Sequence, residues 1–352
     1  MPVNFSTAKH AATEPANMKP SDIEMNRQLY RYDSNWAFCR FDHPEIIGGR
    51  FGFGRGIMFP SDYGWPGQDP SASSTGLRIE LLTTKGAYLY IEYEKYRDDQ
   101  LEFDTGTFRH LLRDNGRDII NVQGFPDILW EMESEDGFVK VDFSVKPLKV
   151  LTLPDNILAR TIFSMWLAVC RAQGTITVNG ISAAVNGAFF LDHPRLTAAR
   201  NDIKEFGSYL YTPIALDDGS YFMSYYSDFL DGSQNHGYCF GYYMDQSRNV
   251  SVYEGKSISD LCFTAENQVK RVNLVFENDS STIELFIKGE EYPVLRTWGT
   301  GSIPRRKADN RVFPQPFAAD FIMTGAGAKT NLTGKGITEY IKNEKRPFLI
   351  EP

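Results

Sequence analysis

Short runs of apolar residues recur along this chain at intervals of roughly ten residues, either alternating with polar residues or continuous. Gly, Asn, Asp and Pro separate them, and helical periodicity is nearly absent. This pattern is typical of a β-sandwich or β-barrel. A first series of strands is predicted at 50–59, 76–84, 86–96, 117–123, 127–133 and 137–145. A second series is predicted at 205–216, 219–229, 236–246, 249–255, 259–265, 269–276, 281–288, 291–299 and 334–341.

Turn residues between these runs predict β-hairpins. The clearest turns are Lys85-Gly86, Glu135-Asp136-Gly137 and Asn179-Gly180. One stretch differs from the rest, because an apolar run follows Pro154, with Asp155 or Asn156 in position to cap a helix. We therefore expect one short helix there, within an otherwise all-β chain.

The two strand series have similar lengths, which predicts two consecutive β-domains. The first twenty-odd residues are polar and contain proline, so residues 1–28 are expected to form a flexible arm. The predicted first domain then covers 29–200 and the predicted second domain covers 201–352.

Composition narrows the classes of partner. The 352 residues carry 45 Asp and Glu against 37 Lys and Arg, a net charge of −8, which argues against a nucleic-acid surface. No apolar run reaches the roughly 20 residues of a membrane helix, so no integral membrane segment is expected. The four cysteines stand far apart and are expected to be reduced, and no secretory signal is visible. We expect a cytoplasmic protein, and the sequence leaves a homodimer open.

Aromatic residues are unusually frequent, with 25 Phe, 18 Tyr and 5 Trp. Strand alternation places Tyr88, Tyr90, Glu92, Glu94 and Tyr96 on one face of 86–96. By the same rule, Tyr221, Met223 and Tyr225 share one face, and Tyr238, Phe240, Tyr242 and Met244 share another. A barrel lined by tyrosines would hold a long, mostly apolar ligand that carries a few oxygens. The alternative is that these residues fill ordinary cores.

Asp192 and His193 end a largely apolar strand, and His193 could act as an acid or base near neutral pH. Neighbours on a strand point to opposite faces, so the two residues face one pocket only if the strand ends there. The alternative is a structural role, in which they lock the junction between the domains by hydrogen bonds.

Signatures of cofactors and metals are missing or misplaced. The glycines in GFGRG lack dinucleotide spacing, and GAGAKT at 325–330 lacks the spacing of a phosphate loop. The five histidines form no H-x-x-x-H or H-x-H pair. We therefore expect no dinucleotide site, no phosphate loop and no metal.

The segment GTITVNGISAAVNGAFFLDH, from Gly174 to His193, resembles the hydroxyneurosporene synthase-like family. This family of tandem lipocalin-like proteins includes carotenoid hydratases, bacterial AttH-type proteins and fungal lipocalin-like Diels–Alderases. The closing GKGITEY is similar to the family's last strand. The chain departs from the family at Phe190, where many members have Trp, at Pro194 and Arg195, and at Asn35-Trp36 in place of Glu-Trp-Trp.

The resemblance implies two consecutive lipocalin-like (calycin-type) antiparallel β-barrel or sandwich domains, with a pocket inside or between them. It also implies hydrophobic polyene or isoprenoid substrates and no cofactor. Candidate catalytic residues are Glu92, Tyr90 and Tyr225 by position, and Asp192 and His193 by motif. Candidate substrate-binding residues are Trp36, Phe53, Tyr88, Phe190, Tyr221, Tyr238 and Tyr242.

Three functions remain as hypotheses. The first is a cofactor-independent enzyme of specialised metabolism that cyclises, isomerises or hydrates its substrate by holding a reactive conformer and donating hydrogen bonds. The second is a lipid or pigment carrier without chemistry. The third is a glycan-binding or carbohydrate-active sandwich, for which Trp65 would be a loop platform.

Overall fold

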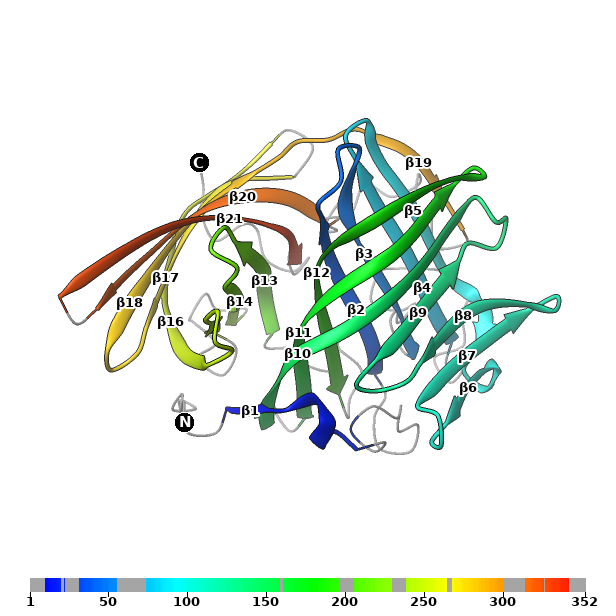
Figure 1. Cartoon of the computed structure of the whole chain (residues 1–352), viewed down its shortest axis with the longest axis horizontal. Coiled ribbons are helices and arrows are strands. Elements are labelled where there is room, and N and C mark those ends of the chain that lie inside the picture. Colours follow the sequence, from blue (N-terminus) through cyan, green and yellow to red (C-terminus); the bar gives the residue numbers. More distant parts are fainter. Residues whose placement is uncertain are drawn as a thin grey trace. The chain divides into compact units, whose positions relative to one another are not determined.

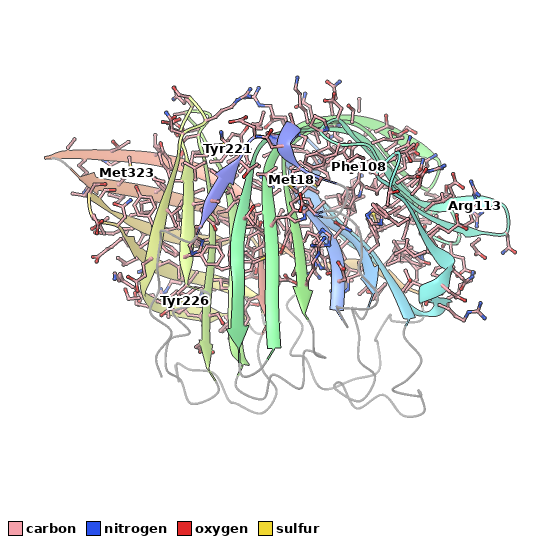
Figure 2. The ribbon with its side chains drawn as sticks, turned by 90° about the horizontal axis from the view of Figure 1, so that it is seen from below. Met18, Phe108, Arg113, Tyr221, Tyr226 and Met323 are labelled. Carbon is pink, nitrogen blue, oxygen red and sulfur yellow. The ribbon has the colours of Figure 1, made fainter. Side chains whose placement is uncertain are left out.

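The computed structural model describes residues 10–19, 22, 32–55, 74–158, 161–196, 206–229, 239–264, 268–299, 314–325 and 327–341. Nearly all of these residues lie in β-strands (Figure 1). Two short 3-10 turns, η2 (Pro15–Asn17) and η3 (Asp98–Gln100), interrupt them. The prediction of an all-β fold is confirmed. No helix within the described ranges has the length and apolar character that crossing a membrane requires.

One unit of the chain is built on a thirteen-stranded sheet that curls on itself (Figure 1). Its strand order is β19-β5-β4-β3-β2-β12-β11-β10-β9-β8-β7-β6, and β1 pairs with β10. The strands are β1 (Ala11–Thr13), β2 (Tyr32–Phe41), β3 (Ile46–Arg55), β4 (Ser74–Thr83), β5 (Gly86–Arg97), β6 (Leu101–Asp104), β7 (Arg109–Asp114), β8 (Arg117–Gln123), β9 (Ile128–Glu133), β10 (Val139–Leu158), β11 (Thr161–Val178), β12 (Ile181–Leu196) and β19 (Val294–Trp298).

The second unit is a closed antiparallel barrel of eight strands. The strands are β13 (Phe206–Leu216), β14 (Tyr221–Phe229), β15 (Phe240–Met244), β16 (Val250–Phe263), β17 (Val269–Glu277), β18 (Ser281–Gly289), β20 (Gln315–Gly325) and β21 (Ala328–Ile341). Side chains fill the barrel from every strand around it, among them Ile214, Phe222, Phe276, Leu285 and Phe321, all almost completely buried. The prediction of two lipocalin-like β-domains is confirmed.

The short helix expected after Pro154 was a wrong prediction. Residues 139–158 form one long strand that pairs antiparallel with β11. Proline removes an N–H from a sheet and is tolerated at bulges, and the register skips Pro154 and Asp155 at such a bulge. The apolar residues around it, such as Leu151 and Met165, are buried as strand residues.

The hairpin predictions hold where the turn chemistry was strongest. Asn179 and Gly180 have φ values of 49° and 76° and join β11 to β12 in a two-residue turn. β4 and β5 pair from Thr83 opposite Gly86 onward, which is the predicted hairpin.

Each of the two units is made of more than one segment of the chain. The sheet unit comprises Ala11–Ile203 and Pro293–Pro304, and the barrel unit comprises Met1–His10, Lys204–Tyr292 and Arg305–Pro352. The strand expected at 291–299 is therefore β19. It pairs in parallel with β5 in the first sheet instead of continuing the second strand series. Within the predicted arm, β1 pairs with β10.

The two faces of the sheet can be told apart by what packs on them. We define the concave face as the one whose residues form the continuous apolar core, with Ala37, Phe51, Ile79, Leu191 and Phe189 as members. The convex face carries the alternating residues of the same strands. Many of these are also buried, including Phe38, Phe190 and Leu167.

Candidate functional site

Polar side chains collect at one end of the concave face, in the last two rows of residues across the sheet. Five of them are Asp33, Asn35, Glu92, His193 and Arg195, all at most 9% exposed. The next row inward is apolar and includes Ala37, Phe51 and Ile79. The concave face therefore has an apolar floor that ends in a buried polar group.

His193 and Asp33 form the centre of this group. His193 Nε2 lies 2.6 Å from Asp33 Oδ1, and both side chains are fully buried. Nε2 has two neighbours, the Asp33 carboxylate at 2.6 Å and the Arg195 Nε–H at 3.3 Å. The carboxylate only accepts hydrogen bonds and is the closer of the two, so we assign the proton to Nε2, which donates a hydrogen bond to Asp33. The lone pair of the neutral imidazole is then on Nδ1, for which the described part of the chain provides no hydrogen-bond partner.

The environment keeps His193 neutral. Burial lowers the pKa of His193 below its usual value, and the guanidinium of Arg195 lowers it further, while Asp33 opposes the shift. Arg195 Nε lies 3.3 Å from His193 Nε2 and 3.8 Å from Asp33 Oδ1, so its charge faces the carboxylate. At neutral pH the pair is therefore a carboxylate that orients an uncharged imidazole, the arrangement of a general base.

A backbone carbonyl from the N-terminal segment lies against the same group. Asp22 O accepts hydrogen bonds from Trp166 Nε1 at 2.8 Å and from Arg195 Nη2 at 2.5 Å. The ring of Trp166 also meets His193 edge-to-face, with centroids 5.4 Å apart. These contacts hold Arg195 and Trp166 in place around the imidazole.

Asn35 extends the group along β2. The register sets Trp36 opposite Asp192 and Asp33 opposite Arg195, which brings Asn35 beside His193 on the concave face. Asn35 Nδ2 is buried and has no hydrogen-bond partner in the described residues. An unpaired buried amide N–H costs about 1–3 kcal/mol, so an exception of this kind needs an explanation.

Phe53 stands opposite Asn35 on β3 and is fully buried. Its ring meets His110 and Trp130, with centroids 5.3 and 5.6 Å away. This predicted substrate-binding residue therefore lies on the concave face, in the same row of residues as Asn35.

The predicted residues of β5 also lie on the concave face. Glu92 is fully buried and accepts a hydrogen bond from Lys95 N at 2.9 Å across a bulge in the strand. Tyr90 meets Trp298 of β19 at 5.5 Å, and burial raises its pKa, with Tyr96 and Glu92 adding to the shift. Tyr88 is half-buried against Phe138, with centroids 5.7 Å apart. In the strand order, β3 and β4 lie between β5 and β2, whereas Asp33 and His193 join the adjacent strands β2 and β12.

Three predicted residues lie on the opposite, convex face. Trp36 donates from Nε1 to Ser34 Oγ at 2.9 Å and packs under the guanidiniums of Arg50 and Arg78. Phe190 and Asp192 alternate with His193 on β12 and are buried on that same side. Because β12 continues to Leu196, the strand does not end at this point, and Asp192 and His193 face opposite sides of the sheet.

The predicted tyrosines of the second domain lie on the outer face of the barrel. Tyr225 stacks on Tyr211 at 4.4 Å, and Tyr242 Oη lies 2.6 Å from His10 Nδ1. Tyr221 shares this face, because its neighbour Phe222 points into the barrel. Alternation grouped these residues correctly, but the expectation that they line the barrel interior is wrong, since side chains such as Phe222 fill that space. Tyr238 and Trp65 lie outside the described residues.

Sequence reasoning missed Asp33, Asn35 and Arg195. The alternation Asp33-x-Asn35-x-Ala37-x-Cys39 was visible and places two polar groups on a buried face at the start of a strand. The alternation could not show that β12 lies beside β2, because Asp33 and His193 are 160 positions apart in the sequence. Within the described residues, no group of three His, Cys, Asp or Glu side chains is arranged to hold a metal ion.

Solved structures share the fold of this chain. No family model and no curated protein matches the chain. A crystal structure described as a putative AttH from Nitrosomonas europaea matches with a TM-score of 0.58, over 92% of this chain and 96% of that chain, at 14% sequence identity. Kievitone hydratase from Nectria haematococca matches with a TM-score of 0.50, over 88% of each chain, at 8% identity. The chain therefore has the AttH-type tandem lipocalin-like fold, as the segment ending at His193 had indicated.

Proposed function

We propose that this protein is a cofactor-independent enzyme that hydrates, isomerises or cyclises a hydrophobic polyene or isoprenoid, with His193 as its acid–base group. One observation carries the proposal. The imidazole is held at Nε2 by Asp33, and its other nitrogen, Nδ1, is buried without a hydrogen-bond partner in the described chain.

The apolar floor next to the pair supports the substrate class. Ala37, Phe51, Ile79 and Leu191 are at most 3% exposed, belong to the continuous apolar core and carry no polar group. A polyene or isoprenoid carbon chain that enters among these side chains would be stabilised there by the hydrophobic effect. A sugar, which needs many hydrogen bonds, would not be.

Proton transfer separates the three reaction classes. Hydration and double-bond isomerisation each require a proton to be taken up and returned, which His193 Nδ1 can do. Ring closure by preorganisation alone requires no such group. The Asp33–His193 pair therefore favours hydration or isomerisation. The structural likeness to kievitone hydratase, a hydratase by its name, also supports hydration.

The test is solvent proton exchange. The purified protein is incubated in deuterium oxide with a panel of linear and cyclic isoprenoids and polyenes, without metal or nucleotide, and deuterium uptake is followed by mass spectrometry. We expect uptake into at least one member. We also expect Asp33→Asn and His193→Gln to reduce its rate by about 10²–10⁴-fold, the usual contribution of general acid–base catalysis.

Asp320→Asn is the matched control, because Asp320 is exposed on β20 of the barrel. Far-UV circular dichroism and thermal melting show whether each variant is folded. Full activity in folded His193→Gln would overturn the assignment of His193. Tight binding and unchanged release of every panel member would instead indicate a carrier.

A further inference from the structure

Two buried polar side chains on the concave face stand on the adjacent strands β2 and β12, and each has one atom for which the described residues provide no hydrogen-bond partner. These atoms are Asn35 Nδ2, which can only donate a hydrogen bond, and His193 Nδ1, which in the neutral imidazole can only accept one. The register that places Asn35 beside His193 brings their Cβ atoms to about 5 Å. A donor and an acceptor so placed complement a molecule that offers both functions.

The form of His193 restricts the chemistry further. Because Nε2 keeps its proton and donates a hydrogen bond to Asp33, Nδ1 holds a lone pair and has no proton to give in the resting state. Addition to an isolated double bond begins with protonation of carbon, which this nitrogen cannot start. Addition to a double bond conjugated with a carbonyl begins with attack by a nucleophile, which a base promotes.

We propose that the substrate carries a carbonyl group conjugated with the reacting double bond, and that the Asn35 amide donates a hydrogen bond to that carbonyl oxygen. The inference rests on the proposed function and adds the functional group that the site recognises. Asn35 becomes a catalytic residue of the oxyanion-binding kind, since its donor faces the oxygen on which charge develops.

The step balances without any other reactant. Nδ1 takes a proton from water while the water oxygen bonds to the β-carbon, and the electrons of the double bond move to give an enolate. The enolate oxygen accepts the hydrogen bond from Asn35. The imidazolium then returns its proton to the α-carbon, so one water molecule is added and His193 is neutral again.

Phe53 and Trp166 surround this pair with apolar surface. Phe53 is opposite Asn35 on the neighbouring strand, and Trp166 packs against the ring of His193. The carbonyl end of the substrate would therefore lie at the polar group while its carbon skeleton follows the apolar floor. Trp166 also provides a fluorescence signal close to the proposed binding position.

The experiment uses three probes that share one carbon skeleton. They are β-ionone, which has a conjugated carbonyl, dihydro-β-ionone, which has an unconjugated one, and the corresponding hydrocarbon without oxygen. Binding to the full chain is measured by tryptophan quenching, and deuterium uptake from deuterium oxide by mass spectrometry. We expect both ketones to bind about tenfold more tightly than the hydrocarbon, the effect of one buried hydrogen bond.

Asn35→Leu is the decisive variant, because leucine has a similar size and no donor. We expect it to bind all three probes equally and to melt no lower than wild type, since the amide has no protein partner to lose. Asn331→Ala, at an exposed position of β21, is the control and should change neither property. A ketone preference that survives in Asn35→Leu, or a lower melting temperature, would overturn the role of Asn35.

The design separates this inference from the proposed function. His193→Gln should lose deuterium uptake and keep the ketone preference. If the wild-type protein prefers ketones but exchanges no proton, the proposed enzymatic activity is contradicted and the proposed carbonyl-binding site is supported. Exchange without ketone preference, or no binding of either ketone, would contradict the carbonyl site.

Discussion

Arg50 and Glu80 form an ion pair on the convex face of the first sheet, and their side chains are 1% and 0% exposed. They stand opposite each other on β3 and β4. Arg50 also lies over the ring of Trp36, 5.2 Å from its centroid. Glu80 Oε1 also lies 3.7 Å from Arg78 Nη1. Two charges so deeply buried still depend on each other, because removing either one leaves the other with less compensation in a medium of low dielectric constant.

Removing one member of this pair should therefore cost more than removing both. We expect Arg50→Met and Glu80→Leu each to lower the free energy of unfolding by about 3–5 kcal/mol, and the double variant to recover a large part of that loss. Urea unfolding of the four proteins gives the coupling energy. Additive single effects would show that the two side chains do not act as a pair.

Gly52 is required by the ring of Trp36. A Cβ atom at this position would lie 2.0 Å from Trp36 Cε3, which no small adjustment relieves. We expect Gly52→Ala to destabilise the protein by about 1–3 kcal/mol or more, the usual range for overpacking. Combining it with Trp36→Leu should remove most of that penalty. Thermal melting checks both, and an unaffected single variant would contradict the contact.

Asp136 secures β19 to the first sheet. Its carboxylate accepts hydrogen bonds from Trp298 Nε1 at 3.2 Å and from Arg296 Nη2 at 2.7 Å. Burial alone would raise the pKa of Asp136, but hydrogen bonds from Ser134 and the Phe138 backbone, with the charge of Arg296, lower it overall.

We expect Asp136→Ala to lower stability by about 1–2 kcal/mol, because the donors lose a charged acceptor. The loss should be local, with faster amide hydrogen exchange over 294–298. Glu284→Ala, exposed on β18, is the control. Unchanged exchange in β19 would show that strand pairing with β5 alone holds it.

Two histidines, the half-buried His10 and the buried His193, predict sensitivity to acid. Burial lowers the pKa of His10 from 6.5 to about 4, and burial lowers that of His193 as well. The unfolded chain then binds more protons than the folded chain below pH 6.5, so stability falls as the pH drops from about 6.5 toward 4.

Each histidine can contribute a slope of up to about 1.4 kcal/mol per pH unit in this range. We expect His10→Gln and His193→Gln each to flatten the dependence of unfolding free energy on pH, measured with urea between pH 7 and 5. Curves parallel to wild type would mean that the pKa of each imidazole is the same in the folded and the unfolded protein.

The site shows where prediction from sequence reached its limit. His193 was identified by its motif and Phe53 by its place in a strand, and both lie on the concave face. Asp33 and Asn35 were not predicted as site residues, because their role depends on the pairing of β2 with β12. Tyr225 and Tyr242 were grouped correctly and placed on the wrong side, since alternation does not say which side is filled.

By itself, the sequence determined the strand periodicity, the tight turn at Asn179-Gly180 and the sets of residues that share a face, because these depend on a few neighbouring residues and on backbone geometry. Only the tertiary structure decided that β19 joins the first sheet, that Asp33 meets His193, and that Tyr221, Tyr225 and Tyr242 face outward. A period of two is unchanged when a strand is turned over, so the choice of face rests with packing between strands that are distant in the chain.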